Sequence, residues 1–254
     1  MTRAADEPPG RRPRRQWRTP RWLLFLSVFA LIPLSSALLR TLFVAERELG
    51  EAAAIGFSSG VLWFAAGTGV SLMFCIAFRH SPRPYIIAHE LTHALFGLLS
   101  LAKVSDLKLA KDGGSIRVSK DNMLILLSPY FFPFYAFCLL AVYALLSLAV
   151  PLAGTIASRV FVASVGAAWG YHFAWTINAL LQRQNDLEEY GYVYSFNFIL
   201  AANLLALCVF FVILTPMPTS RLCKIFRAET ISVMGWFYDF NANIIRRILL
   251  SVRT

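Results

Sequence analysis

Five long runs without a charged residue restrict the possible folds of this chain more than any other feature. They are 18, 27, 36, 23 and 31 residues long and comprise Trp22–Leu39, Ala52–Phe78, Met123–Ser158, Val160–Gln182 and Tyr190–Ser220. About 20 apolar residues cross the hydrocarbon of a bilayer as a helix, so each run is long enough, or nearly so, to span a membrane. Charged residues make up 15% of the chain, against roughly 25% in soluble domains. We therefore expect an integral, multi-pass membrane protein rather than a soluble helical one.

Two further elements lie between the second and third runs. Tyr85–Ala102 is a sixth apolar helix candidate, and it follows Pro82 and Pro84, which prevent the preceding helix from continuing. In the polar segment 103–120, apolar and polar residues alternate on both sides of Asp112-Gly113, a strong hairpin signal. The predicted fold is an all-α polytopic membrane bundle of about six transmembrane or re-entrant helices, with one small β-hairpin at about residues 103–120.

Both ends of the chain are basic. Seven arginines lie in Met1–Arg21, and an arginine-rich arm before the first apolar run predicts a disordered segment with the N-terminus in the cytoplasm. A nucleic-acid-binding arm is the alternative, but no nucleic-acid-binding motif accompanies it, and we expect no nucleic-acid partner. The tail from Arg221 combines basic and apolar residues in a way that is typical of an amphipathic helix on an anionic lipid surface. The predicted segments are an arm at 1–21, N-terminal transmembrane helices at 22–84, a core at 85–216 and a basic amphipathic tail at 217–254.

The sixth apolar segment carries the sequence His89-Glu90-Leu91-Thr92-His93. On a helix, histidines four residues apart project from one face and can share one Zn²⁺, with the intervening Glu as a general base for water. The alternative is a helical turn whose histidines bond to backbone carbonyls. Because ionisable residues in an apolar helix are costly, a functional role is the better interpretation. We expect His89 and His93 to be metal ligands and Glu90 to be catalytic.

A catalytic zinc site needs a third protein ligand, which is often a carboxylate or another His. Asp186 is the favoured candidate among the acids at the end of the fourth run. Glu188, Glu189 and His172 remain alternatives, and His172 could instead be a buried neutral His beside a ligand. Asn185 could bond a ligand carboxylate or a developing oxyanion.

The order of these features resembles the site-2 protease family of intramembrane zinc metalloproteases. It comprises HExxH on a membrane helix, a short hairpin, a proline-containing helix, and a late Asp preceded by Asn. The resemblance covers roughly residues 85–203, and it implies that Asp186 is the third zinc ligand and that the hairpin lies beside the substrate. Thr92 stands where the family usually has Gly, and Gln184–Leu187 lacks the Gly and Pro of the family's late motif.

A zinc site with these ligands constrains the topology. Six full spans would put His89 and Asp186 near opposite faces of the membrane, yet ligands of one zinc lie about 2 Å from it. We therefore expect the helix that carries the HExxH motif to re-enter without crossing. Pro129 and Pro133 interrupt the third run, and the carbonyls that they leave without a partner need a neighbouring helix or water, so we expect this face to line a cavity.

The predicted function is that of a zinc metalloendopeptidase, which cleaves a membrane-protein substrate in or near its transmembrane segment. The hairpin edge would hold an extended peptide by strand addition, although a surface hairpin without a role is also compatible with the pattern. Two alternatives stay open: a membrane zinc hydrolase that acts on a lipid amide or another non-protein substrate, and a non-catalytic metal-binding scaffold. The lipid hydrolase would not need the hairpin edge, and the scaffold would tolerate loss of Glu90.

Overall fold

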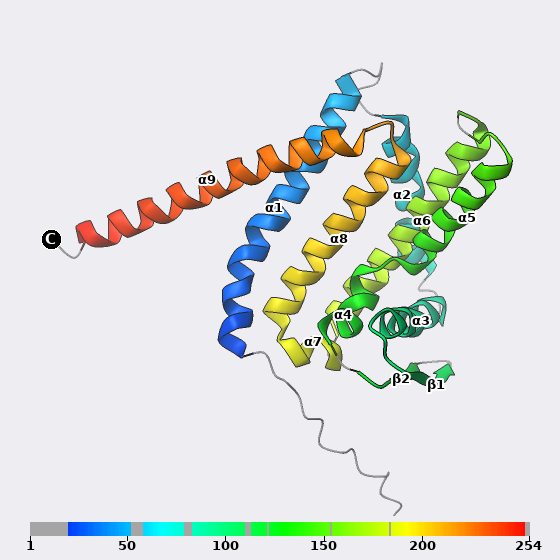
Figure 1. The fold of residues 1–254 in the computed structure, drawn as a ribbon, viewed down its shortest axis with the longest axis horizontal. Helices are drawn as coiled ribbons and strands as arrows, with labels where there is room; N and C mark the ends of the chain where they lie inside the picture. The colour runs from blue at the N-terminus through cyan, green and yellow to red at the C-terminus, as the bar shows by residue number, and fades with distance from the viewer. Residues whose placement is uncertain are drawn as a thin grey trace, which may run out of the picture.

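The computed structural model describes residues 20–51, 58–78, 83–109, 113–120, 122–152, 154–182 and 184–251. Within these ranges the chain forms helices and one two-stranded hairpin, shown in Figure 1. The helices are α1 (Arg21–Glu51), α2 (Ser59–Phe78), α3 (Arg83–Leu99), α4 (Met123–Phe131), α5 (Phe134–Ala149), α6 (Ile156–Leu180), α7 (Asn185–Tyr190), α8 (Tyr192–Leu214) and α9 (Thr219–Ser251). The strands are β1 (Val104–Leu109) and β2 (Gly114–Val118), which pair antiparallel. This arrangement confirms the predicted all-α bundle with one hairpin.

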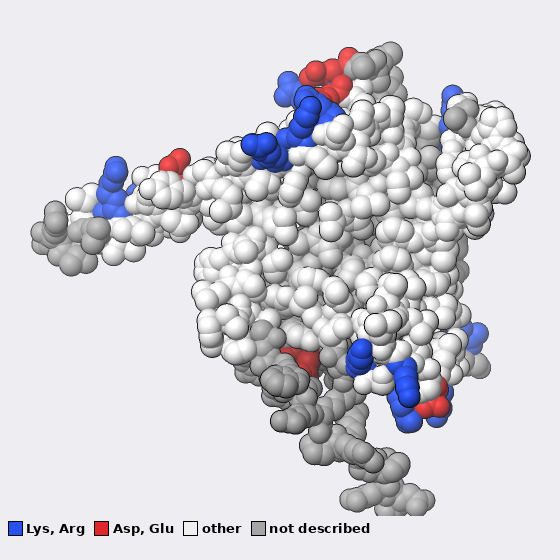
Figure 2. Space-filling view, viewed as in Figure 1, with Lys and Arg blue, Asp and Glu red and all other residues white. Residues whose placement is uncertain are grey.

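Three of the described helices, α1, α2 and α8, are long and apolar enough to cross a membrane. A fourth span results if α4 and α5, bent by 78° at their junction, count as one. Large apolar side chains on these helices face outward, as in Phe43 of α1 and Met73 of α2. Figure 2 shows the charged residues gathered at the two ends of the bundle and along α9, with an uncharged band between the ends. The molecule therefore has the surface that a lipid environment requires.

The run Val160–Gln182 forms most of α6, which is long enough to cross a membrane but not apolar enough to be a candidate span. Polar residues such as His172 and Thr176 lower its hydropathy and are buried in the bundle. Helix α6 packs along α2, and a side chain at Gly67 or Gly166 would collide with the backbone of the opposite helix. These glycines allow the two helices to approach closely, as small residues do in membrane helix pairs.

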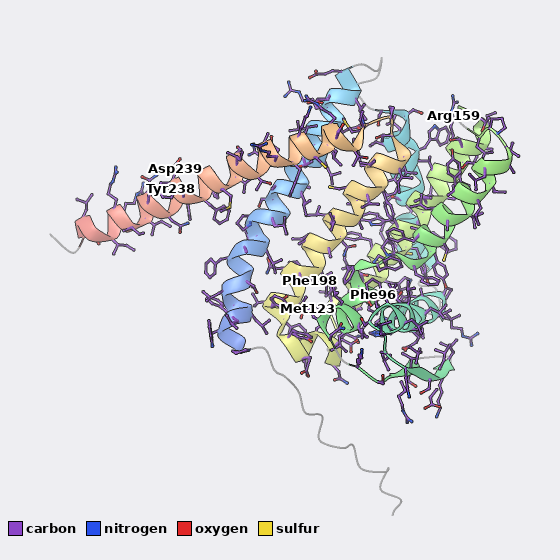
Figure 3. All side chains as sticks on the ribbon, in the orientation of Figure 1. Phe96, Met123, Arg159, Phe198, Tyr238 and Asp239 are labelled. Atoms are coloured by element: carbon purple, nitrogen blue, oxygen red, sulfur yellow. The ribbon has the colours of Figure 1, made fainter. Side chains whose placement is uncertain are left out.

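Helix α3 is not parallel to the long helices. In Figure 1 it is seen almost end-on, whereas α1, α5, α6 and α8 extend across the view. The hairpin, α4 and α7 gather around α3 at one end of the bundle, which we call the site end, and α9 starts at the opposite end. Figure 3 places Phe96, Met123 and Phe198 around α4 at the site end and Arg159 at the opposite end. The HExxH helix and Asp186 thus lie at the same end of the bundle.

The third run breaks where its prolines lie. Pro129 is inside α4, and Pro133 is the N-cap of α5. Both prolines are fully buried, so they pack against protein rather than line an open cavity. A neighbouring helix, as shown below, provides a partner for one of the carbonyls that they leave without an N–H.

The structure describes the C-terminal tail but only part of the N-terminal arm and of the hairpin turn. The tail is helical, as expected, and extends away from the bundle beyond its contact with α1 (Figure 1). Arg40 of α1 forms an ion pair with Glu229 of α9, and Glu48 forms another with Arg221. Residues 1–19 of the arginine-rich arm and Lys111-Asp112 of the hairpin turn lie outside the described residues.

Candidate metal centre

Helix α3 places both histidines of the motif on one face. A residue advances about 100° around an α-helix, so positions 89 and 93 differ by roughly 40°. Their rings meet edge-to-face with centroids 4.8 Å apart. His93 is buried, and the His89 side chain is 17% exposed. The pair therefore lies at the margin between the bundle interior and the surface of the site end.

A proline in α4 explains the orientation of His93. In a regular helix the carbonyl of Ile125 would accept the N–H of residue 129, but residue 129 is Pro and has no N–H. The Nδ1–H of His93 instead donates to this carbonyl at 2.8 Å. Because Nδ1 carries the proton, the lone pair of Nε2 is free and directed toward Asp186. His93 is thus held in the tautomer that a metal ligand needs.

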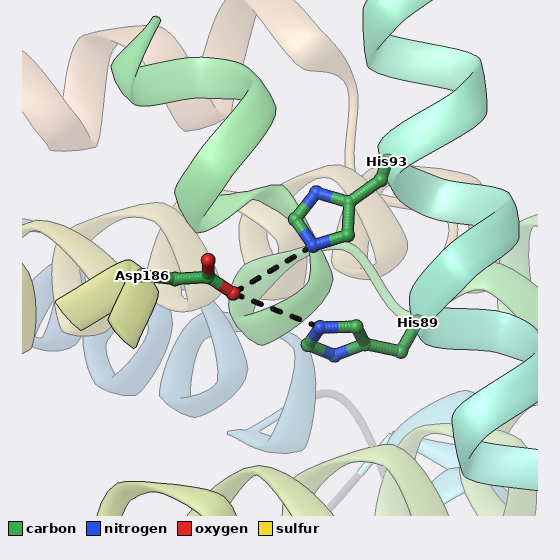
Figure 4. Close-up of side chains that lie close together, drawn as sticks. All are labelled: His89, His93 and Asp186. Atoms are coloured by element: carbon green, nitrogen blue, oxygen red, sulfur yellow. Dashed lines mark ion pairs between the residues drawn. The ribbon is translucent and has the colours of Figure 1, made fainter. Parts of the chain in front are cut away.

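Asp186 comes from the short helix α7, more than 90 residues after the histidines. Its Oδ2 lies 3.8 Å from His89 Nε2 and 3.7 Å from His93 Nε2 (Figure 4). The three candidate ligand atoms lie within 4.8 Å of one another. Tetrahedral zinc with bonds of about 2.0 Å holds its ligand atoms about 3.3 Å apart. The observed separations exceed this value by about 0.4 to 1.5 Å, so side-chain adjustments of that size would let these residues hold a divalent metal ion.

Electrostatics favour the charged form of the third ligand. Burial raises the pKa of the Asp186 carboxyl, but the nearby His93 and His89 and the hydroxyl of Tyr130 outweigh this effect. The pKa of Asp186 therefore lies below its ordinary value. The carboxylate is ionised at neutral pH, which is the form that binds metals.

Helix α7 is anchored by packing on one side and by a backbone bond on the other. Leu187 is completely buried in a cluster with Leu127, Tyr130 and Ile199. The hydroxyl of Ser195 donates to the backbone carbonyl of Leu187 at 3.2 Å. These contacts fix Leu187 in place. Because Asp186 is the preceding residue, they also restrict the direction of the Asp186 carboxylate.

The alternative third ligands lie elsewhere. His172 is buried in α6 with Nε2 at 3.5 Å from the Thr176 hydroxyl, and it is not part of the group formed by His89, His93 and Asp186. Glu188 and Glu189 of α7 are exposed, as is Asn185, and none of them belongs to this group. The structure therefore brings together the three residues that the sequence favoured.

Glu90 is buried next to the hairpin. Gly114, the first residue of β2, approaches it so closely that an added Cβ would lie 2.5 Å from Glu90 Cγ and 2.9 Å from Glu90 Oε1. Val118 at the other end of β2 approaches Gly97 of α3 in the same way. Strand β2 therefore runs alongside α3 and begins at the carboxylate of Glu90. This glycine contact could not be predicted from the sequence, because it depends on how the hairpin folds back.

The fold and the site together define a class of protein: a helical bundle with membrane-compatible surfaces and a candidate three-ligand metal centre at one end. No protein-family model, no curated protein and no solved structure matches this chain.

Proposed function

We propose that this protein is an intramembrane zinc metallopeptidase, similar to the site-2 protease family, which cleaves a membrane-protein substrate in or near its transmembrane segment. The observation that carries the proposal is the convergence of His89, His93 and Asp186 beside the buried carboxylate of Glu90. Two imidazoles and one carboxylate are a ligand set of known zinc hydrolases.

In peptide hydrolysis, three residues would hold the metal ion and Glu90 would transfer the proton. Bound Zn²⁺ would supply Lewis-acid chemistry, which polarises a carbonyl and acidifies water. Glu90 follows His89 directly and lies roughly 60° around the helix from His93, so its carboxylate is next to the ligand group. It accepts the proton of the attacking water and delivers it to the leaving amine. His89, His93 and Asp186 would hold the ion.

The hairpin provides the place for an extended substrate. Ser119 donates from its backbone N–H to the carbonyl of Lys103 at 2.9 Å, so odd-numbered residues of β2 face β1. The N–H and C=O of Ile116 therefore point to the free edge of a two-stranded sheet. An added strand there would run past Glu90, because β2 begins at Gly114. Strand addition exposes a scissile bond that a helical substrate would keep in its own hydrogen-bond ladder.

We assign the site end to the cytoplasmic side. Basic residues of the hairpin region, such as Lys108 and Arg117, gather there, and α1 begins there directly after the arginine-rich arm (Figure 1). Labelling of a single cysteine at Lys108 in intact cells tests this orientation, since a membrane-impermeant reagent would reach it only if the site end faced outward.

Replacing Ile116 with Pro should lower cleavage of a protein substrate at least tenfold. The substitution removes the N–H on the free edge of β2 and leaves the N–H groups that face β1 intact. Ile116→Ala is the matched control, since it removes the side chain and keeps the edge N–H. The measurement is the rate of substrate cleavage by the full chain in proteoliposomes. Equal rates for the two variants would contradict strand addition at the hairpin edge.

Replacing Gly114 with Ala should lower kcat and leave metal binding unchanged. The new methyl group would overlap with Glu90, which must move away from its position beside the ligands. Gly113→Ala is the control, because a Cβ at Gly113 meets nothing within 4 Å. Steady-state kinetics together with metal analysis of the purified variants separate the two effects. A normal kcat for Gly114→Ala would show that the position of Glu90 does not matter.

A further inference from the structure

Helix α4 contacts two of the three candidate ligands, one through Ile125 and the other through Tyr130. The Ile125 carbonyl accepts a hydrogen bond from His93 Nδ1–H. The hydroxyl of Tyr130 donates a hydrogen bond to Asp186 Oδ2 at 3.2 Å. Neither Ile125 nor Tyr130 belongs to the HExxH motif or to the late acidic cluster. Both contacts are made by groups of the protein and therefore act on the ligands independently of the ion.

The Ile125 carbonyl has no capacity for a further donor. A carbonyl oxygen has two lone pairs, and here it accepts His93 Nδ1–H at 2.8 Å and the Ser128 hydroxyl at 3.0 Å. An ordinary residue at position 129 would add an N–H that is directed at the same oxygen. Pro129 prevents this competition, so the carbonyl stays available to His93.

Tyr130 lies between the ligand His89 of α3 and the ligand Asp186 of α7. It is completely buried, and its ring meets His89 edge-to-face with centroids 5.3 Å apart. Its hydroxyl reaches Asp186, which lies across from His89. One side chain thus limits the movement of a ligand from α3 and bonds a ligand from α7.

The backbone of Tyr130 is itself fixed. The side-chain amide of Asn203 in α8 donates to the Tyr130 carbonyl at 3.0 Å, and His172 of α6 also bonds the backbone of Tyr130. Pro133 follows three residues later and ends the helical path of α4. The polar groups of α6 and α8 therefore fix α4, rather than bind the metal themselves. This gives the buried His172 a role at the site without making it a ligand.

We propose that the Pro129-Tyr130 pair of α4 is the positioning device of the metal centre: Pro129 keeps the Ile125 carbonyl available to orient His93, and Tyr130 holds Asp186 opposite the histidines. The inference rests on the proposed metal centre and not on the substrate. Groups that bond to metal ligands typically change metal affinity by about 10–100-fold when they are removed.

The test compares metal affinities of the full chain purified in detergent. Zn²⁺ is titrated against a chromophoric chelator for wild type, Tyr130→Phe, Pro129→Ala and the double variant. The controls are Tyr143→Phe, which loses a hydroxyl bonded to Ser158, and Pro33→Ala, which changes another buried helical proline. We expect a 10–100-fold weaker affinity for each α4 variant and no change for the controls. The Co²⁺ absorption spectrum should also change in the Tyr130→Phe variant, which a purely structural role would not cause.

Melting of the metal-free proteins separates positioning from folding. Tyr130→Phe keeps the ring and should melt like wild type, so its affinity decides the question even if Pro129→Ala is destabilised. Unchanged affinity and an unchanged Co²⁺ spectrum for Tyr130→Phe would overturn the proposal. Failure of wild type to bind Zn²⁺ would overturn both this inference and the proposed centre. Metal binding without peptidase activity would overturn the proposed function alone, since the affinity differences would remain.

Discussion

Replacing Glu90 with Gln is expected to abolish peptide cleavage while Zn²⁺ stays bound. The amide has the size of the carboxylate and fits the same space beside Gly114, but it cannot accept a proton from water. A general base contributes about 10²–10⁴-fold to the rate of a hydrolase. The measurement is quantitative proteomics of membrane fractions from cells with wild type or the variant, in which substrates accumulate uncleaved only in the variant. Metal analysis of the purified variant accompanies it.

Glu188→Gln is the matched control for this experiment. It makes the same chemical change in an exposed residue of α7 that bonds the hydroxyl of Tyr192. We expect its proteome to match that of wild type. If the Glu90→Gln cells showed no accumulated substrate, the scaffold alternative would be favoured over an enzyme. Accumulation of a lipid amide rather than a protein would point to the other alternative.

Replacing Asp186 with Ala is expected to remove most of the bound Zn²⁺. The site would lose its only anionic ligand among His89, His93 and Asp186, and two neutral imidazoles hold zinc poorly without a third protein ligand. Since removal of a group that only supports a ligand already costs about 10–100-fold in affinity, we expect a loss on the order of 100-fold or more. The measurement is zinc content after dialysis against a chelator of known affinity.

Glu188→Ala and Glu189→Ala are the controls for Asp186. Both residues share α7 with Asp186 but are exposed, and neither belongs to the group formed by His89, His93 and Asp186. Their zinc content should equal that of wild type. Full occupancy in the Asp186→Ala variant would show that another group, such as His172, supplies the third ligand and that the geometry at Asp186 is incidental.

Much of the fold could be predicted because lipid constrains sequence so strongly. A helix that faces hydrocarbon must be long and free of charge, and the runs that became α1, α2 and α8 are recognisable for that reason. The alternation around Gly113 was also sufficient to predict the hairpin. The end of α6 could not be predicted, since polar residues that are buried between helices look the same in sequence as polar residues in a loop.

The candidate site divides in the same way. His89 and His93 could be paired from sequence alone, because the helical repeat fixes the relation of residues four apart. Asp186 could be favoured only by its residue type and by a resemblance, since no local rule relates positions almost 100 residues apart. Its proximity to the histidines depends on α3 lying crosswise, which brings both ligand sources to one end of the bundle.

The supporting groups could not be found from sequence at all. The sequence showed that Pro129 leaves a carbonyl without its usual N–H partner. It did not show that His93 would be the donor to this carbonyl. Tyr130 and Gly114 gave no signal, because a phenol and a glycine are common in apolar helices and hairpins. The sequence thus determined which segments can face lipid and which side chains can hold a metal, since both follow from local chemistry and helical periodicity. Only the tertiary structure decided which carbonyl orients His93, which hydroxyl holds Asp186 and which strand lies against Glu90, because those contacts join elements whose packing no local pattern encodes.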